Sequence, residues 1–161
     1  MAGWTESGLY AATLNQLLQV ATAPNWLLTT NKFFLTNNSD TPNYAQAASS
    51  AIYASTNECN GTGWAAGGVA VSALAAGPAS IAPTLTISSP PPTVAVWGAT
   101  NISVATTTIP AAYGGYFYWA AGSPQAKIIG IYFGGSGYAT TAGTFAVTWA
   151  AGVFANITCA S

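Results

Sequence analysis

Apolar residues near the N-terminus recur at helical spacing. One side of the implied helix holds Tyr10, Leu14, Leu17, Leu18 and Ala21. Such a stripe is typical of an amphipathic helix that packs on a core. Thr5 is suited to be the N-cap, Glu6 places a negative charge in the first turn, and Pro24 ends the helix. The pattern predicts one helix over residues 6–21, so that residues 1–30 form a helix and a linker.

From residue 31 onward the apolar positions follow the period of two that is typical of β-strands. The clearest early strand spans residues 32–36 (KFFLT), and shorter β segments are predicted at residues 50–54, 69–74 and 83–87. In the C-terminal half the alternating positions are Val94 and Val96, then Ile102, Val104 and Thr106, then Ile129, Ile131 and Phe133, then Phe145, Val147 and Trp149, before a last strand over residues 153–158.

Turn residues separate these segments. A polar loop occupies residues 37–43, glycines recur over residues 57–68 and 134–137, and consecutive prolines at positions 90–92 mark a rigid connection. Many short strands between Gly, Pro and Asn turns are typical of a sandwich or a small barrel. We therefore predict a single mainly-β domain: a β-sandwich, jelly-roll or immunoglobulin-like, over residues 31–161 with one N-terminal α-helix.

Aromatic side chains at residues 116–119 occupy both faces of one predicted strand. We expect Phe117 and Trp119 to face the core, and Tyr116 and Tyr118 to lie at the surface or at an interface. There the tyrosines would form a carbohydrate platform or a protein contact, since Tyr is enriched at both kinds of surface. The large same-face residues of the two best strands are expected to share one core: Ile129, Ile131, Phe145, Val147 and Trp149.

The chain carries almost no charge. It has no histidine and no arginine, its charged residues make up 3% of the total, and its formal net charge is −1. An acid–base pair would have to use Asp40 and Glu58, and a catalytic triad lacks its histidine. We therefore predict no enzymatic activity, no catalytic residue, and no metal or cofactor site. Glu58 is expected to make a structural hydrogen bond in the turn over residues 57–63.

Nucleic acids and membranes are disfavoured as partners. Lys32 and Lys127 are the only basic residues, too few for the phosphate contacts of a nucleic-acid surface. No run of about 18 apolar residues exists, so no membrane span is predicted. The glycine-rich residues 61–68 lack the Lys-Ser/Thr ending of a phosphate-binding loop. Residues 1–8 carry no basic segment of a signal peptide, so synthesis in the cytoplasm is expected.

The cysteines and the glycosylation sequons leave alternatives open. Cys59 and Cys159 are compatible with a long-range disulfide or with two separate buried thiols. Asn-x-Ser/Thr sequons occur at Asn37, Asn60, Asn101 and Asn156. A chain rich in Asn, Ser and Thr produces such sequons by chance, and a secreted glycosylated module is the alternative.

A net charge close to zero favours life in an assembly. Free soluble proteins usually keep a larger net charge, because mutual repulsion prevents association. Aromatic residues, which make up 12% of the chain, are enriched at protein interfaces. We expect uncharged contacts with neighbouring molecules through residues 37–44, residues 61–68 and the N-terminal segment around Trp4.

Six stretches follow one another along the chain: NKFFLT (31–36), DTPN (40–43), NECNGTGWAAGG (57–68), VWGATNI (96–102), IIGIYFG (128–134) and GTFAVTWAAGV (143–153). In order and spacing they resemble a family of tailed-bacteriophage virion proteins, and the NECNGTGWAAGG block is the most specific of them. Two residues depart from the family pattern. Cys59 stands where an aliphatic residue is usual, and Tyr132 stands where an Asp usually precedes Phe-Gly.

The resemblance implies a structural component of a phage particle, in the first place a capsid decoration or cement protein on the capsid surface. Its partners would be the major capsid protein and neighbouring copies of itself, with no catalytic site, after synthesis in the host cytoplasm. One alternative is a tail, neck or fibre component that contacts a host receptor, including sugars. The other is the secreted glycosylated binding module.

Overall fold

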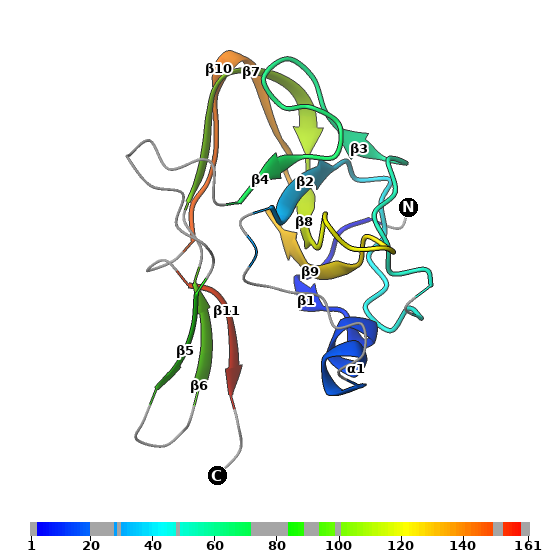
Figure 1. The fold of residues 1–161 in the computed structure, drawn as a ribbon. Helices are drawn as coiled ribbons and strands as arrows, with labels where there is room; N and C mark the ends of the chain where they lie inside the picture. Colours follow the sequence, from blue (N-terminus) through cyan, green and yellow to red (C-terminus); the bar gives the residue numbers. More distant parts are fainter. Residues whose placement is uncertain are drawn as a thin grey trace.

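The computed structural model describes residues 3–19, 28, 30–47, 49–71, 84–88, 94–98, 101–149 and 153–158. Over these residues the protein is mainly β, with antiparallel strand pairs and one short helix, α1 (Ala11–Gln19) (Figure 1). This architecture confirms the predicted mainly-β, sandwich-like fold with a helix near the N-terminus. No helix in the described part of the chain is long and apolar enough to cross a membrane.

The largest sheet is built around β2 (Lys32–Thr36), whose bounds match the predicted KFFLT strand. Across the sheet the strands are β1 (Gly8–Leu9), β9 (Lys127–Tyr132), β8 (Gly114–Tyr118), β2 and β3 (Glu58–Cys59), while β4 (Val69–Ala70) also pairs with β2. Phe34 lies opposite Tyr116, and Phe33 lies opposite Phe117. Because successive residues of a strand point to opposite faces, both faces of the sheet receive aromatic rings.

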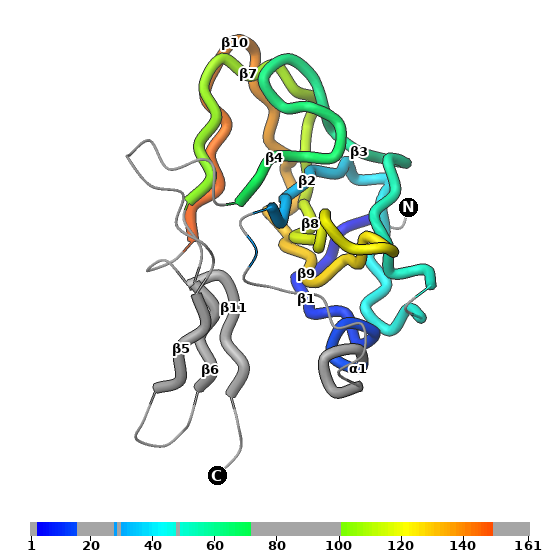
Figure 2. The backbone as a smooth tube through the Cα atoms, viewed as in Figure 1, coloured from blue at the N-terminus to red at the C-terminus, as the bar shows by residue number. Residues whose placement is uncertain are grey.

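A long two-stranded antiparallel ribbon of β7 (Ile102–Ala112) and β10 (Tyr138–Val147) arches over one face of this sheet (Figures 1 and 2). Its register shifts several times between Tyr138 and Phe145, and Thr106 and Ala142 have positive φ angles of 57° and 51°. Such bulges bend and twist a strand pair. The bend lets the ribbon close over the sheet as the second layer of the sandwich.

The main core lies between the sheet and the ribbon of β7 and β10. Its buried residues are Phe33, Leu35, Cys59, Trp64, Val71, Ile102, Ile109, Ala112, Phe117, Ile128, Ile129, Phe145, Val147 and Trp149, and Ile131 packs against them. The predicted shared core of Ile129, Ile131, Phe145, Val147 and Trp149 is therefore confirmed.

A second core lies on the opposite face of the sheet, where a surface or an interface was expected. It contains Trp4, Tyr10, Ala12, Phe34, Ala51, Tyr116 and Tyr118. The prediction that Tyr116 and Tyr118 lie at the surface or at an interface is wrong: both are fully buried within the chain, while Phe117 faces the main core as predicted and Trp119 is only partly buried. The reason is that the N-terminal segment and the chain around Tyr44 and Ala51 fold over this face.

The helix begins later than predicted. Gly8 and Leu9 pair with β9, so α1 starts at Ala11 and Thr5 is not its N-cap. Leu14 is 44% exposed, whereas the neighbouring Thr13 is buried and donates a hydrogen bond from Oγ1 to the carbonyl oxygen of Lys127 at 2.6 Å. The side chains of Leu17 and Leu18, and all of Ala21 and Pro24, lie outside the described residues.

A separate three-stranded sheet has the order β11 (Val153–Thr158), β6 (Val94–Gly98) and β5 (Thr84–Ser88). These strands agree with the β runs predicted around residues 83–87, 94–97 and 153–158. The segment at residues 50–54 contributes a single bridge, between Ile52 and Ala126. Of the predicted segment 69–74 the structure describes residues 69–71, in which Val69–Ala70 form a strand. The prolines at positions 90–92 lie outside the described residues.

Candidate functional site

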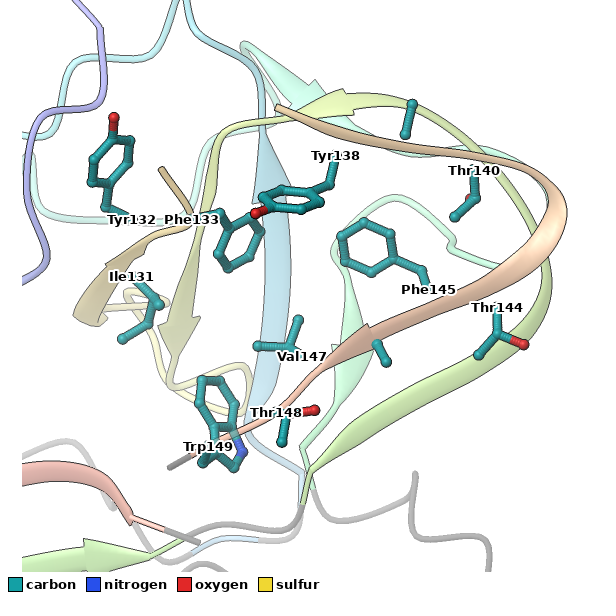
Figure 3. Close-up of a pocket in the computed structure, with 12 residues that line it drawn as sticks. Ile131, Tyr132, Phe133, Tyr138, Thr140, Thr144, Phe145, Val147, Thr148 and Trp149 are labelled. Atoms are coloured by element: carbon teal, nitrogen blue, oxygen red, sulfur yellow. The ribbon is translucent and has the colours of Figure 1, made fainter. Parts of the chain in front are cut away.

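An open groove lies between the end of β9 and the strand β10 (Figure 3). Its volume is about 540 Å³, within the usual range of small ligand sites. The lining residues are Ile131, Tyr132, Phe133, Tyr138, Ala139, Thr140, Thr144, Phe145, Ala146, Val147, Thr148 and Trp149. None of these twelve carries a charge. The groove is therefore a neutral surface of rings, methyl groups and hydroxyls.

The groove runs along the edge of β10. Every residue from Thr144 to Trp149 lines it, although Phe145, Val147 and Trp149 are buried and the intervening Thr144, Ala146 and Thr148 are exposed. A surface that meets residues of both faces of a strand lies at its edge. Among the strands that the structure describes, β10 pairs only with β7. The edge that faces the groove is thus not covered by a described strand.

Aromatic rings gather at one end of the groove. Phe133 contacts Tyr138 edge-on with a centroid distance of 6.3 Å and Phe145 at 6.4 Å. Tyr138 is 54% exposed, and Figure 3 shows its ring beside those of Phe133 and Phe145. The turn that brings Tyr138 to this place contains Gly134 and Gly137, both with positive φ. The sequence predicted this turn but not the groove that it creates.

The two carboxylates proposed as the only acid pair have separate tyrosine partners. Asp40 accepts a hydrogen bond from the Tyr116 hydroxyl at 2.5 Å. Glu58 accepts hydrogen bonds from the Tyr53 hydroxyl at 2.8 Å and from the backbone N–H of Gly67 at 2.7 Å. Glu58 makes structural hydrogen bonds as predicted, but its partners Tyr53 and Gly67 lie outside the predicted turn over residues 57–63. Each carboxylate thus anchors a covering loop to the second core.

Lys127 is held above the same aromatic cluster. Its Nζ lies 4.2 Å from the ring centroid of Tyr116 and 5.9 Å from that of Phe34. Burial lowers the pKa of Lys127, while the nearby negative charge of Asp40 acts in the opposite direction. A cation placed over a ring face is attracted by the quadrupole of the ring. The lysine therefore contributes to the packing of the second core.

The interface residues predicted from the sequence differ in their exposure. The Trp4 side chain itself is only 4% exposed, packs on Tyr116 at 4.9 Å and donates from Nε1 to Thr36 Oγ1 at 2.9 Å. The residues that follow it, 5–7, are exposed, so the contact predicted for the segment around Trp4 stays a prediction. Residues 37–44 and 61–68 do keep exposed positions, so their predicted role as contacts stays a prediction.

Cys59 is a free thiol buried in the main core, and burial raises its pKa to about 11. Its Sγ lies 3.5 Å from the carbonyl oxygen of Ala111. The other cysteine, Cys159, lies outside the described residues. Within the described chain no three His, Cys, Asp or Glu side chains come together as a metal site.

Comparison of the chain with known protein families, with curated proteins and with solved structures found no match. Conclusions about function therefore depend on the residues and on the geometry described above.

Burial of the tyrosines leads to a prediction for alkaline pH. The pKa of Tyr53 and of Tyr118 is raised from 10.0 to about 12, mainly by burial, and burial also raises the pKa of Tyr10, Tyr44 and Tyr116. Between pH 10 and pH 12 the unfolded chain loses phenolic protons that the folded protein keeps. The free energy of unfolding should therefore be fully retained below pH 10 and fall as the pH rises through 12.

Urea unfolding at a series of alkaline pH values, with phenolate absorbance recorded in parallel, measures this effect. Because burial lowers the pKa of Lys127, its deprotonation raises the free energy of unfolding with pH up to its ordinary pKa of 10.5. The effect of the tyrosines is therefore measured above pH 10.5. Tyr53→Phe should make the decline shallower. A stability that stays constant up to pH 12 would contradict the burial of these phenols.

Proposed function

We propose that the protein is a structural component of a tailed-phage particle, a capsid decoration protein bound to major capsid proteins and to neighbouring copies of itself. The observation that carries this proposal is the neutral outer surface. Of the five charged residues, Asp40, Glu58 and Lys127 are engaged with aromatic side chains, and Lys32 is half-buried. Of the five, only the side chain of Glu6 is largely exposed to solvent. Such a surface is poorly suited to free monomers but fits permanent contact with other proteins.

The work of such a protein is mechanical. A protein that binds only the assembled lattice shifts the equilibrium toward the intact shell by mass action. Burial of apolar surface contributes roughly 25 cal/mol per Å² at each copy, and the loss of free motion on association offsets part of it. Many copies acting together therefore stabilise the shell without any catalytic group.

The resemblance to phage virion proteins supports this proposal, and its most specific block has a structural role here. Within residues 57–68, Gly63, Gly67 and Gly68 all have positive φ angles, which favour glycine. The Glu58 carboxylate in the same block binds the N–H of Gly67. The same block contributes Cys59 and Trp64 to the main core, and its Gly67 carbonyl accepts the Tyr118 hydroxyl of the second core, so these residues support the fold.

One feature that a receptor-contacting role could use is not at the surface. The aromatic strand at residues 116–119 was a candidate sugar platform, but the rings of Tyr116 and Tyr118 are buried. Their hydroxyls donate to Asp40 and to the carbonyl oxygen of Gly67. A capsid role needs no sugar platform, and for this reason we favour it over a tail, neck or fibre component.

Attachment to the particle should survive high salt. Ion pairs are screened within about 3 Å at 1 M salt, but a neutral interface has few of them to lose. Purified particles incubated at low ionic strength and at about 1 M NaCl should keep the same number of bound copies, measured by quantitative mass spectrometry of the pelleted particles. Release at high salt alone would mean that charges of the partner dominate the contact. Absence of the chain from the particles at both salt concentrations would refute the proposed function.

A further inference from the structure

We propose that the groove beside β10 receives an extended, uncharged segment of a neighbouring capsid protein, which adds to the edge of β10 as a further strand. This inference rests on the proposed function and identifies the surface through which the protein is held on the particle. The partner segment is defined by its chemistry: an extended backbone with small or apolar side chains and no charge.

The backbone of β10 supports an extended partner. In an edge strand, alternate N–H and C=O groups point away from the single neighbouring strand, ready to pair with another chain. In the described structure β10 pairs only with β7. From Phe145 to Val147 this pairing is regular, with Phe145 opposite Val104, Ala146 opposite Ser103 and Val147 opposite Ile102. The opposite edge of this regular stretch borders the groove.

Protection of the β10 edge differs along its length. Between Tyr138 and Phe145 the register shifts repeatedly, and bulges of this kind discourage pairing with a further strand. After Phe145 the pairing is regular, and the strand contains no lysine or proline that would protect its edge. Natural proteins seldom leave such an edge uncovered. The docking segment should therefore be centred on residues 145–147, with the flanking Thr144 and Thr148 beside its two ends.

The groove walls define the side chains of the segment. A strand that adds to an edge inserts alternate side chains into pockets beside that edge. Here the pocket contains the rings of Phe133, Tyr138 and Phe145. All twelve lining residues are uncharged, so a charged partner side chain would be desolvated without a counter-charge. The absence of charge on the lining side chains therefore favours a partner segment that is itself neutral and apolar.

A saccharide is the weaker occupant. The polar side-chain groups that line the groove are tyrosine and threonine hydroxyls and the indole N–H of Trp149, and no lining side chain has a carboxylate, amide or guanidinium group. A sugar would also leave the backbone edge of β10 uncovered, whereas an added strand satisfies the edge and the rings together. The two occupants differ in a measurable way, because only a strand protects backbone amides from exchange.

The test compares two lysine substitutions on the same strand. Thr144 and Thr141 are both exposed residues of β10, but only Thr144 lines the groove. Thr144→Lys should reduce the copies bound per particle by about tenfold or more, because it places an unpaired charge in the docking site. Thr141→Lys should bind like the unchanged protein. Thermal unfolding of both variants checks that they fold, and Thr148→Lys, at another exposed groove position, serves if Thr144→Lys does not.

Hydrogen–deuterium exchange adds the second measurement. In the unchanged protein, amides of residues 144–148 should exchange about tenfold or more slowly on the particle than in free solution. Equal binding of the Thr144→Lys and Thr141→Lys variants would overturn the docking site while leaving the proposed function intact. Loss of binding by Thr144→Lys without amide protection would overturn strand addition in favour of a ligand that uses the rings alone. If the unchanged chain is absent from the particles, the proposed function fails and this inference fails with it.

Discussion

Replacing Trp149 with alanine should lower the free energy of unfolding by about 3–5 kcal/mol. The Trp149 side chain is 6% exposed and belongs to the main core, where it meets the Phe33 ring edge-on at 5.9 Å. Truncation removes its apolar contacts and leaves a cavity that continues into the groove beside β10. Urea denaturation monitored by circular dichroism measures the loss.

Tyr138→Ala is the matched control for Trp149→Ala. Both residues are large aromatics that line the same groove, but Tyr138 is 54% exposed. Its truncation should cost less than about 1 kcal/mol, because little buried area is lost. Similar losses in the two variants, or a loss below about 1 kcal/mol for Trp149→Ala, would show that Trp149 does not hold the ribbon of β7 and β10 on the sheet.

The strands whose alternation is strict could be predicted from the sequence. Phe145, Val147 and Trp149 alternate with small residues, and the structure buries them together as expected. The KFFLT strand was predicted with its observed bounds. In both cases the period of two reports a physical fact, because one face of the strand packs on a core.

The second core was missed because alternation was interpreted as burial on one side only. Phe33 and Phe34 are adjacent, as are the four aromatic residues from Tyr116 to Trp119. A continuous apolar run is the pattern of a strand that is buried on both faces. That signal was present in the sequence. The loop that covers the second face contains Asp40 and Tyr44, and nothing in its polar composition indicated where it would pack.

The predicted start of the helix was wrong for a related reason. Tyr10 was expected on the buried side of a helix that starts near residue 6, and it is buried. Its partners are the rings of Tyr44 and Tyr116, however, and its backbone N–H bonds to the carbonyl oxygen of Ile128. Pairing of the preceding Gly8 and Leu9 with β9 competes with the helix, and tertiary contacts of this kind override local propensity.

The groove could not be predicted because it depends on an absence of pairing. The alternation of β10 predicts a strand but does not specify how many neighbours it has. In the described structure β9 and β10, which lie on either side of the Gly134–Gly137 turn, do not pair with each other: β9 pairs with β1 and β8, and β10 pairs with β7. The lining residues Phe133 and Tyr138 were predicted only as strand and turn residues.

Gly68→Ala should also be strongly destabilising, with an expected loss of about 3 kcal/mol or more. Gly68 has a φ angle of +71°, immediately precedes β4 and packs closely against the backbone of β2. An added Cβ would overlap the carbonyl oxygen of Phe33 and would lie 2.7 Å from the Cα of Phe34. Both are backbone atoms of the central strand, so the clash cannot be relieved by rotating a side chain. Urea denaturation of the purified variant gives the magnitude.

Gly134→Ala separates the two causes of that loss. Gly134 also has a positive φ angle, of +103°, but a Cβ there would meet nothing within 4 Å. The free energy of unfolding of this variant should therefore fall only by the cost of the positive φ angle, about 1–2 kcal/mol. The difference in unfolding free energy between Gly68→Ala and Gly134→Ala then measures the cost of the steric clash between the 57–68 turn and β2. Residues of β2 belong to both cores. Equal losses in the two variants would mean that this turn can move aside to avoid the clash. Gly68 would then be required only for its positive φ angle.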